Sequence, residues 1–465
     1  MVDYKALLSE IWGYAETGFE EYKSSEAMCK FLENEGFTVT RNIAHMETAY
    51  EAVYGSGHPV ICFLAEYDAL FGMNQKADVT HYDPITSPND TGHGCGHHLL
   101  GTGSIRAAVE FKNYLQENNL AGTVKLVGCP AEESGSGKAY LARDGYFNDC
   151  DIALTWHPDN YNQVSTGSSQ SCISCFFKFH GVSAHAAGAP HLGRSALDAC
   201  ELMNVGVNYL REHMLPSDRV HYAYTNAGGK APNVVQSEAV LKYFVRSATN
   251  PVCEELYQRV INCAKGAALM TGTTVDVIFD EGLSNTVPNF VLEDVLADSF
   301  RKIYKNDYTE EELAYAQSFK DTFDIKNVLS DIPQFAKDSQ AVIQNIKERP
   351  INDYFIETNH SDVCEMGSTD VGDVSWCVPT AQINTACYSI GAGAHSWQWV
   401  AQGKSSIAYK GCMLAGDVLF DAAKTLYQNP ELIEKAKAEL KTRLQDDSYK
   451  CLIPKDVLPH ISNVE

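Results

Sequence analysis

The sequence predicts an α/β protein: a mostly parallel sheet flanked by helices, with a smaller ferredoxin-like unit inserted into the chain. Two observations lead to this fold class. Over residues 59–158, apolar runs typical of buried strands alternate with helical patterns, which is the order that a parallel sheet requires. From about residue 170 the order becomes strand, helix, strand, strand, helix, strand, which is the ferredoxin-like plan.

The first part of the chain contains both kinds of pattern in turn. Apolar residues at helical spacing, such as Leu7, Leu8 and Ile11, predict helical structure over residues 4–35. Short apolar runs then indicate strands, and a 3.6-residue apolar period indicates helices. In chain order these elements are a strand at 59–70, a helix at 98–116, a strand at 123–130, a helix at 138–147 and a strand at 151–158.

The inserted unit and the end of the chain follow. The predicted unit has strands at 172–181, 220–228, 239–248 and 273–282, and helices at 195–214 and 251–272. A buried strand at 380–390 and a long helix at 405–427 return to the first pattern, whereas the charged, irregular residues 306–365 predict no element. We therefore expect residues 1–169 and 285–465 to form one α/β domain around an inserted domain at residues 170–284.

Composition and charge exclude several classes of function. The 465 residues carry 36 Lys and Arg against 60 Asp and Glu, a net charge of −24, and no basic patch is visible. Nucleic acid and anionic membrane surfaces are therefore not expected as partners. The first residues lack the features of a secretory signal, and no membrane-spanning apolar run occurs. We expect a cytoplasmic protein whose 15 cysteines are reduced thiols.

Residues that can bind metals gather in four short segments, each placed where a predicted strand ends. Ligands bind outside the carboxyl ends of the strands in an open α/β sheet, so these side chains are expected to converge. The segments are GHGCGHH (92–98), CPAEESGSG (129–137), TWHP (155–158) and GAHSW (393–397). The candidate ligands in them are Cys95, His97, Glu133, His157 and His395.

Each of these residues alone has a plainer interpretation. A single His is more often a hydrogen-bonded structural residue, Cys95 alone suggests a buried thiol, and Glu132–Glu133 also suits a solvated loop. Together, imidazole, thiolate and carboxylate groups are typical of a divalent-metal site. Five ligands exceed the three protein ligands of a usual catalytic zinc, so the sequence predicts two metals with one bridging group.

Two further carboxylates have predicted roles beside the ligands. Glu132 is adjacent to a proposed ligand, so it can take a proton from a metal-activated water and pass it to a leaving nitrogen. Asp68 ends the apolar run FLAEYD and can orient a ligand imidazole. A strand-end cap is the alternative interpretation of Asp68.

The motifs resemble those of a known family. CGH, PAEE with its Gly-rich continuation, GVSAHAAGAPHLGRSALDA and GGKAPNVVQSEA are similar to motifs of the aminoacylase/carboxypeptidase metallopeptidases, metallopeptidase family twenty. The Cys of CGH indicates the amidohydrolase branch, in which Cys replaces the bridging acid. KGAALMT, STDVGDVSW and YKCLIPKDV extend the resemblance over essentially the whole chain. It implies that residues 1–169 and 285–465 form a catalytic domain and that the ferredoxin-like residues 170–284, called the lid below, serve dimerisation. It also implies two zinc or manganese ions.

The resemblance also implies roles for individual residues. Glu132 matches the general base, and His185 on the lid matches a histidine that stabilises the tetrahedral oxyanion, in several relatives across a dimer. Asn233 and Arg246 match lid positions that hold the substrate carboxylate, with a surface ion pair as the alternative for Arg246. The positions that match metal ligands are Cys95, His97, Glu133, His157 and His395.

The chain departs from the family pattern at two places. The residue after CGH is usually Asn or Asp, whereas this chain has His98, which can add a ligand, alter the metal preference or form a hydrogen bond. Glu66 and Tyr67 replace the more usual acidic spacing before Asp68. No proposed ligand is lost.

The resemblance implies a metal-dependent hydrolase that cleaves the amide bond between an acyl or aryl-acyl group and an amino acid. The best single candidate reaction converts p-aminobenzoyl-glutamate to p-aminobenzoate and glutamate, a reaction of folate catabolism. The expected partners are this small substrate and a second chain, in a homodimer or in a heteromer with a homologous subunit, joined through the lid.

Three alternatives to this function stay open. One is a dipeptidase of the same family, and another is a non-catalytic partner subunit of a heteromeric hydrolase. The third is a redox enzyme that uses Cys172 and Cys175, which are spaced as CxxC. The CxxC lies inside an apolar strand pattern rather than at a helix start, which disfavours a reactive thiol.

Overall fold

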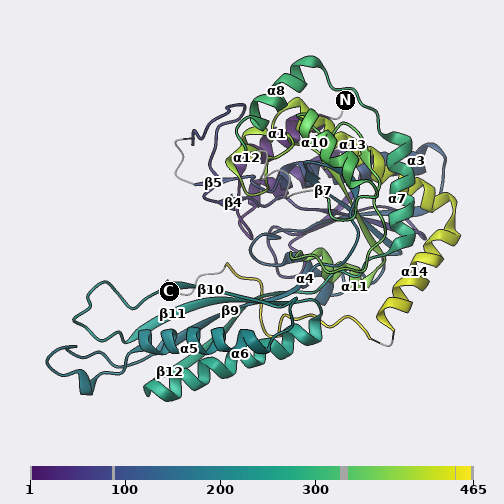
Figure 1. Cartoon of the computed structure of the whole chain (residues 1–465). Coiled ribbons are helices and arrows are strands. Elements are labelled where there is room, and N and C mark those ends of the chain that lie inside the picture. The colour runs from purple at the N-terminus through teal and green to yellow at the C-terminus, as the bar shows by residue number, and fades with distance from the viewer. Residues whose placement is uncertain (1–2, 86–89, 325–332, 446, 462–465) are drawn as a thin grey trace.

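The computed structural model of the chain describes residues 3–85, 90–324, 333–445 and 447–461. It contains a large α/β body and a narrower sheet, covered by two helices, that projects from it (Figure 1). Both predicted parts of the fold class are therefore confirmed.

An eight-stranded mixed sheet forms the centre of the body in the described part of the chain. Its four central strands are parallel neighbours, and antiparallel strands extend it at both sides. In spatial order the strands are β1 (Thr38–Arg41), β2 (Tyr50–Ser56), β6 (Gly122–Gly128), β3 (Val60–Ala65), β7 (Ile152–Asp159), β14 (Thr380–Ala386), β8 (Asn162–Val164) and β13 (Phe355–Ile356).

The central strands are buried on both faces because alternate residues enter two different cores. In β3, Ile61 and Phe63 belong to one hydrophobic cluster, and Cys62 and Leu64 belong to another. The first cluster is covered by α1 (Tyr4–Tyr14), α2 (Tyr22–Asn34), α3 (His97–Glu117), α7 (Phe290–Ile303), α12 (Trp397–Gln402), α13 (Ser406–Gln428) and α14 (Pro430–Leu444). The second is covered by α4 (Gly137–Arg143) and α11 (Val371–Cys377).

The predicted helical stretch at residues 4–35 contains two helices, α1 and α2. α1 ends where Ala15 takes a left-handed backbone conformation with φ 43°, and Phe19 is also left-handed with φ 62°. Neither position carries the Gly that commonly ends a helix in this way, so the residue pattern does not indicate the break. Strands β1, β2 and β8 and helix α7 were also not among the predicted elements.

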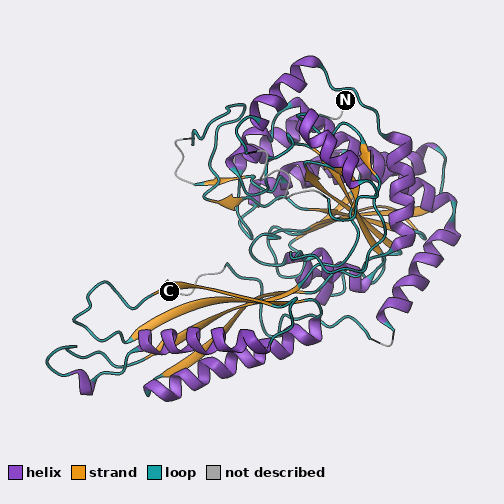
Figure 2. Cartoon of the chain, viewed as in Figure 1, coloured by secondary structure: helices purple, strands orange, loops and turns teal. Residues whose placement is uncertain are grey.

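The projecting sheet has the expected ferredoxin-like topology. Strands in the order β10-β11-β9-β12 are all antiparallel, and α5 and α6 cover one face of the sheet (Figure 2). The elements are β9 (Ser171–His180), α5 (Ala196–Leu210), β10 (Arg219–Asn226), β11 (Glu238–Ser247), α6 (Asn250–Thr271) and β12 (Thr274–Leu283), with short 3-10 turns at Pro190–Leu192 and Arg211–His213. The domain boundaries 1–169, 170–284 and 285–465 stay a prediction.

The CxxC of the redox alternative lies in β9. Residues three apart in a strand point to opposite faces, so the Cys172 and Cys175 thiols are directed apart. Burial raises the pKa of Cys172 to about 12 and also raises that of Cys175. These are properties of inert core thiols and give no support to redox chemistry.

The region where the sequence predicted nothing contains short regular elements. They are α8 (Glu310–Lys320), α10 (Ser339–Glu348) and strand β13. Thr309 and Glu312 form a reciprocal capping box at the start of α8. Among the residues that the structure describes, no helix has the length and apolar character needed to span a bilayer.

A glycine fixes the turn that leads into α3. Gly96 caps the helix with φ 84°, and a Cβ added there would overlap the Tyr388 hydroxyl and the Pro158 ring. Only Gly meets both conditions without strain. The residues on either side, Cys95 and His97, are thereby held in place, after the short ribbon of β4 (Leu70–Phe71) and β5 (Thr91–Gly92).

The substitution Gly96→Ala is expected to lower the midpoint of thermal unfolding. The left-handed backbone alone costs about 1–2 kcal/mol for a residue with a Cβ, before the overlap with Tyr388 is counted. Gly266→Ala in α6 is the matched control, because its Cβ would meet no atom within 4 Å and its backbone is helical. Equal midpoints for the two variants would contradict the strained turn.

Candidate metal centre

Side chains of the metal-ligand type converge at the carboxyl ends of the central strands. Three groups have one potential ligand atom per residue within 4.8 Å of the others. The groups are Cys95, His97 and His157; Cys95, Glu133 and His395; and Glu66, His97 and Glu132. All five predicted ligands and the predicted base lie in these groups, and Glu66 is an addition that the sequence did not single out as a ligand.

The first group joins the turn before α3 to the end of β7. The Cys95 Sγ lies 3.4 Å from Nε2 of His157. His157 Nδ1 lies 2.8 Å from the Pro158 carbonyl oxygen, which only accepts, so Nδ1 carries the proton and Nε2 keeps a lone pair. Burial and the neighbouring His97 lower the pKa of His157, which favours this neutral form.

The second group adds residues that follow β6 and β14. His395 Nε2 lies 3.4 Å from Oε1 of Glu133. The His395 backbone is left-handed, with φ 59°, and its N–H donates to the Gly94 carbonyl at 2.8 Å. Although burial acts to raise it, the pKa of Glu133 is lowered by the hydrogen bond and charge of His395. Cys95 belongs to both groups, so its sulfur would be available to both ions if each group held one.

Asp68 connects the two groups. Its Oδ1 accepts from Nδ1 of His97 at 2.7 Å, and its Oδ2 accepts from the Glu133 backbone N–H at 2.9 Å. The first bond orients the imidazole so that Nε2 faces the centre, and the second positions the turn that carries Glu132 and Glu133. The first of these bonds is the contact that an orienting carboxylate would make, and the role of Asp68 stays a prediction.

Glu132 lies in a crowded anionic environment. Burial raises the pKa of its carboxyl well above the usual range, and the charges of Glu66 and Glu133 add to the effect. Such a carboxylate has a high affinity for a proton, which is the property a general base needs. His97 experiences the same field: burial opposes its charge, but the charges of Cys95 and Asp68 raise its pKa.

The donor set fits divalent metal ions. Nε2 of His97 is buried and makes no hydrogen bond with any described residue. It faces a set of carboxylate, thiolate and imidazole donors, which zinc and manganese accept. Buried carboxylates at this density require compensating positive charge, and metal ions would supply it.

His98 lies outside the three groups. It is fully buried, and its Nε2 lies 2.8 Å from the Gly403 carbonyl oxygen. Its ring packs against His93, with centroids 4.7 Å apart, and burial lowers its pKa well below the usual value. Of the three possibilities left by the sequence, the structure therefore supports hydrogen bonding.

The predicted lid residues do not reach the metal-ligand groups of their own chain. His185 is exposed, and its loop is joined to that of Asn233 by a 3.0 Å hydrogen bond from the Ala186 N–H to the Asn233 carbonyl. Both loops lie at the end of the lid farthest from the body (Figure 1). Arg246 is at the near end of β11, where its Nη1 donates to Ser368 Oγ at 3.3 Å.

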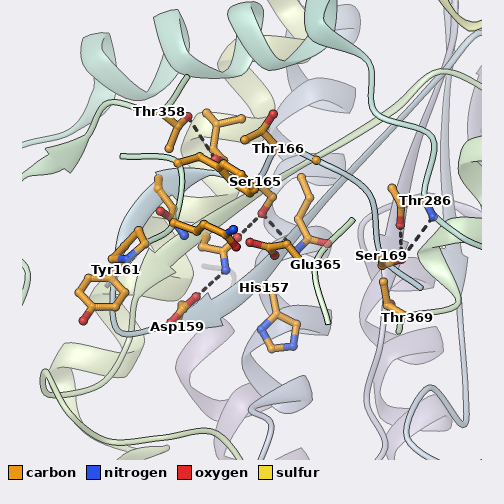
Figure 3. A pocket seen from close by; sticks show the side chains of 18 of the residues that line it. His157, Asp159, Tyr161, Ser165, Thr166, Ser169, Thr286, Thr358, Glu365 and Thr369 are labelled. Atoms are coloured by element: carbon orange, nitrogen blue, oxygen red, sulfur yellow. Dashed lines mark hydrogen bonds between the residues drawn. The ribbon is translucent and has the colours of Figure 1, made fainter. Parts of the chain in front are cut away.

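A cavity of about 690 Å³ opens beside His157 (Figure 3). Asp159 lies two residues beyond His157 on the same face of β7, and Glu365 approaches from a neighbouring segment. Partial burial and the charge of Asp159 raise the pKa of Glu365, and burial raises that of Glu293 to about 8. Within the described chain, the lining includes these three carboxylates and no Lys or Arg.

Comparisons with known proteins agree with this geometry. A model of peptidase family M20/M25/M40 matches residues 62–398. The chain is 40% identical over 460 residues to the B subunit of p-aminobenzoyl-glutamate hydrolase of Escherichia coli K12, covering 98% of this chain and 95% of that protein. It is 26% identical over 458 residues to Xaa-Arg dipeptidase of Mus musculus, covering 95% and 90%.

A solved structure shares the fold. The YXEP protein of Bacillus subtilis, described as a dinuclear metal binding peptidase from the M20 family, matches with a TM-score of 0.54 and 14% identity. The match covers 91% of this chain and 98% of that one. At this identity it supports the fold alone.

Asp68→Asn is expected to weaken zinc binding about 10- to 100-fold, the usual effect of losing a carboxylate that orients a ligand histidine. The measurement is competition with a chelator of known zinc affinity. Asp417→Asn is the control, since Asp417 pairs with Arg106 on α3 and lies in none of the three groups. Unchanged zinc affinity in Asp68→Asn would make Asp68 a strand-end cap only.

Proposed function

The chain belongs to peptidase family M20/M25/M40, and from this premise we propose that it is a metal-dependent amidohydrolase with two divalent ions, zinc or manganese. It would cleave the amide bond between an acyl or aryl-acyl group and an amino acid. The observation that carries the proposal is the pair of ligand groups that share Cys95, with Glu132 beside them.

The residues of the centre divide the work of hydrolysis. Bound ions would polarise the scissile carbonyl and make water a better nucleophile near neutral pH. Glu132 would accept the proton of the attacking water and deliver it to the leaving nitrogen. Asp68 would hold His97 in the tautomer whose Nε2 is free to coordinate.

The substrate proposed first is p-aminobenzoyl-glutamate. The support is the 40% identity, over nearly the whole of both chains, to one chain of a hydrolase named for that compound. Cleavage would release p-aminobenzoate and glutamate.

We assign the lid residues to substrate recognition in an assembly. His185 and Asn233 would serve the site of a second chain, either another copy or a homologous subunit, because their loops lie away from the metal-ligand groups of their own chain. Arg246 would hold a substrate carboxylate, since its guanidinium can bind one bidentately and its Nε has no hydrogen-bond partner among the described residues. The Escherichia coli relative is one subunit of a hydrolase that also has an A subunit, which favours a heteromer.

A second candidate is a dipeptidase for substrates with a cationic side chain. It is favoured by the cavity, whose described lining carries the carboxylates of Asp159, Glu293 and Glu365 and no Lys or Arg. A bound guanidinium or ammonium group would favour the ionised forms of Glu293 and Glu365, whose pKa values are raised in its absence, whereas a glutamate side chain would meet no cationic partner there. The 26% identity to an Xaa-Arg dipeptidase agrees with this candidate.

The deciding experiment measures metal content and turnover on the same purified sample. The substrates are p-aminobenzoyl-glutamate, a set of acyl-amino acids, and dipeptides that end in Arg, Gln or Glu. About two metals per chain with turnover support the proposal and rank the substrates. Metal without turnover favours a requirement for a partner subunit, and no metal after reconstitution contradicts the proposal.

Glu132→Gln is expected to reduce kcat at least about 100-fold with metal content unchanged, because it removes the base but not a ligand. Metal content by mass spectrometry and steady-state kinetics provide the two readouts. Glu439→Gln is the control, because that carboxylate accepts from backbone N–H groups at the start of α7, away from the centre. Loss of metal in Glu132→Gln would instead make Glu132 a ligand.

The cavity can be tested with Glu365→Gln on dipeptides that differ in charge. If Glu365 pairs with a cationic side chain, KM for an Xaa-Arg dipeptide rises up to about fivefold, since partly exposed ion pairs contribute up to about 1 kcal/mol. KM for the Xaa-Gln dipeptide of similar length stays unchanged. Equal changes in KM for both dipeptides would show that Glu365 does not select the charge of the substrate side chain.

A further inference from the structure

Glu66 has no role in the proposed reaction, yet it lies at the centre. It directly follows β3 and is 2% exposed. Its Oε2 lies 3.2 Å from Nε2 of His97, and it shares a ligand-type group with His97 and Glu132.

The 3.2 Å contact between Glu66 and His97 is not a hydrogen bond in this structure. Because Nδ1 of His97 donates to Asp68, a neutral imidazole presents the lone pair of Nε2 to the Glu66 carboxylate. Two acceptors at this distance repel unless a proton or a cation lies between them. Nε2 has no hydrogen-bond partner among the residues described.

The distance is the one expected for two ligands of a single ion. Zinc–nitrogen and zinc–oxygen bonds of about 2.0–2.2 Å at a tetrahedral angle place the two donor atoms about 3.3–3.5 Å apart. The His97–Glu66 distance of 3.2 Å is close to this range. The predicted ligand pairs Cys95–His157 and His395–Glu133 are both 3.4 Å apart.

A buried lysine fixes the orientation of Glu66. The Lys138 side chain in α4 is fully buried, and its Nζ lies 2.7 Å from Oε1 of Glu66 and 2.7 Å from Oδ1 of Asp370. The Lys138 backbone N–H also donates to Oδ2 of Asp370, at 2.8 Å. One oxygen of Glu66 is thus held by the ammonium group, and the other is left facing His97.

We propose that Glu66 is a further metal ligand of this centre, bound to the same ion as His97, and that Lys138 is the positioning residue that holds it there. The inference rests on the proposed function in one respect, that the chain binds divalent ions. It makes the two ions unequal, because only the ion at His97 gains a buried carboxylate held by a lysine.

The test uses metal binding and not turnover. Wild type, Glu66→Gln and Lys138→Met are loaded with zinc, dialysed against a chelator and analysed for bound metal. The same proteins are loaded with cobalt(II), whose visible spectrum reports the ligands of the ion. Lys125→Met is the matched control, because Lys125 is also a buried lysine that pairs with two carboxylates. Its partners are Glu51 in β2 and Asp149 just before β7, and neither belongs to the three ligand-type groups.

Glu66→Gln is expected to retain one zinc where wild type retains two, with an affinity loss of about 100-fold for the other and an altered cobalt spectrum. Lys138→Met is expected to show the same loss in smaller degree. Lys125→Met is expected to lower thermal stability, as Lys138→Met does, but to keep both ions.

Wild-type stoichiometry, affinity and cobalt spectrum in Glu66→Gln would overturn the inference and leave Glu66 as the partner of a protonated His97. This variant decides the question even where Lys138→Met does not fold, because it is nearly isosteric. Failure of wild type itself to bind metal would contradict the proposed function, and is a separate result.

Discussion

The parallel pairing of β6, β3, β7 and β14 is the constraint on which the centre depends. Parallel neighbours end at the same edge of a sheet, so segments far apart in the chain deliver side chains to one place. The segment after β3 supplies Glu66 and Asp68, β6 leads to Glu132 and Glu133, and β7 carries His157 two residues before its end. A shift of one residue in β7 would turn His157 to the opposite face, because side chains alternate along a strand.

The same geometry concentrates negative charge where water is scarce. Glu66 and Asp370 are buried and Glu132 is half-buried, and burial raises the pKa of Asp370 to about 6 even with Lys138 beside it. One lysine does not balance this set of carboxylates and a thiol. Buried charges of one sign destabilise a fold unless they are neutralised, so cations bound at this centre would stabilise the folded chain. Metal ions at this position would therefore contribute to the stability of the folded chain as well as to catalysis.

The sequence predicted the parts of the structure that periodicity and motifs report. Buried central strands and the βαββαβ order of the lid were readable because their apolar patterns are continuous. Three of the four candidate ligand segments follow such a strand, whereas GHGCGHH follows the short ribbon of β4 and β5 and was readable from its spacing of Cys and His. Glu66 was noted only as a departure from a family pattern, because a single acid at a strand end has no distinctive spacing. Its role depends on Lys138, which lies 72 positions later and meets it only through the fold.

The candidate ligands and the cavity wall lie on different kinds of segment. The ligands follow regular strands, whereas much of the cavity wall comes from the irregular residues around Phe335, Thr358 and Glu365, where the sequence predicted no element. Irregular segments tolerate substitution without disturbing the sheet. The ligand set can therefore stay fixed while these segments change what the cavity accepts. The three carboxylates of the cavity, Asp159, Glu293 and Glu365, all lie outside the candidate ligand groups, so the charge of the cavity can change without a change in those groups.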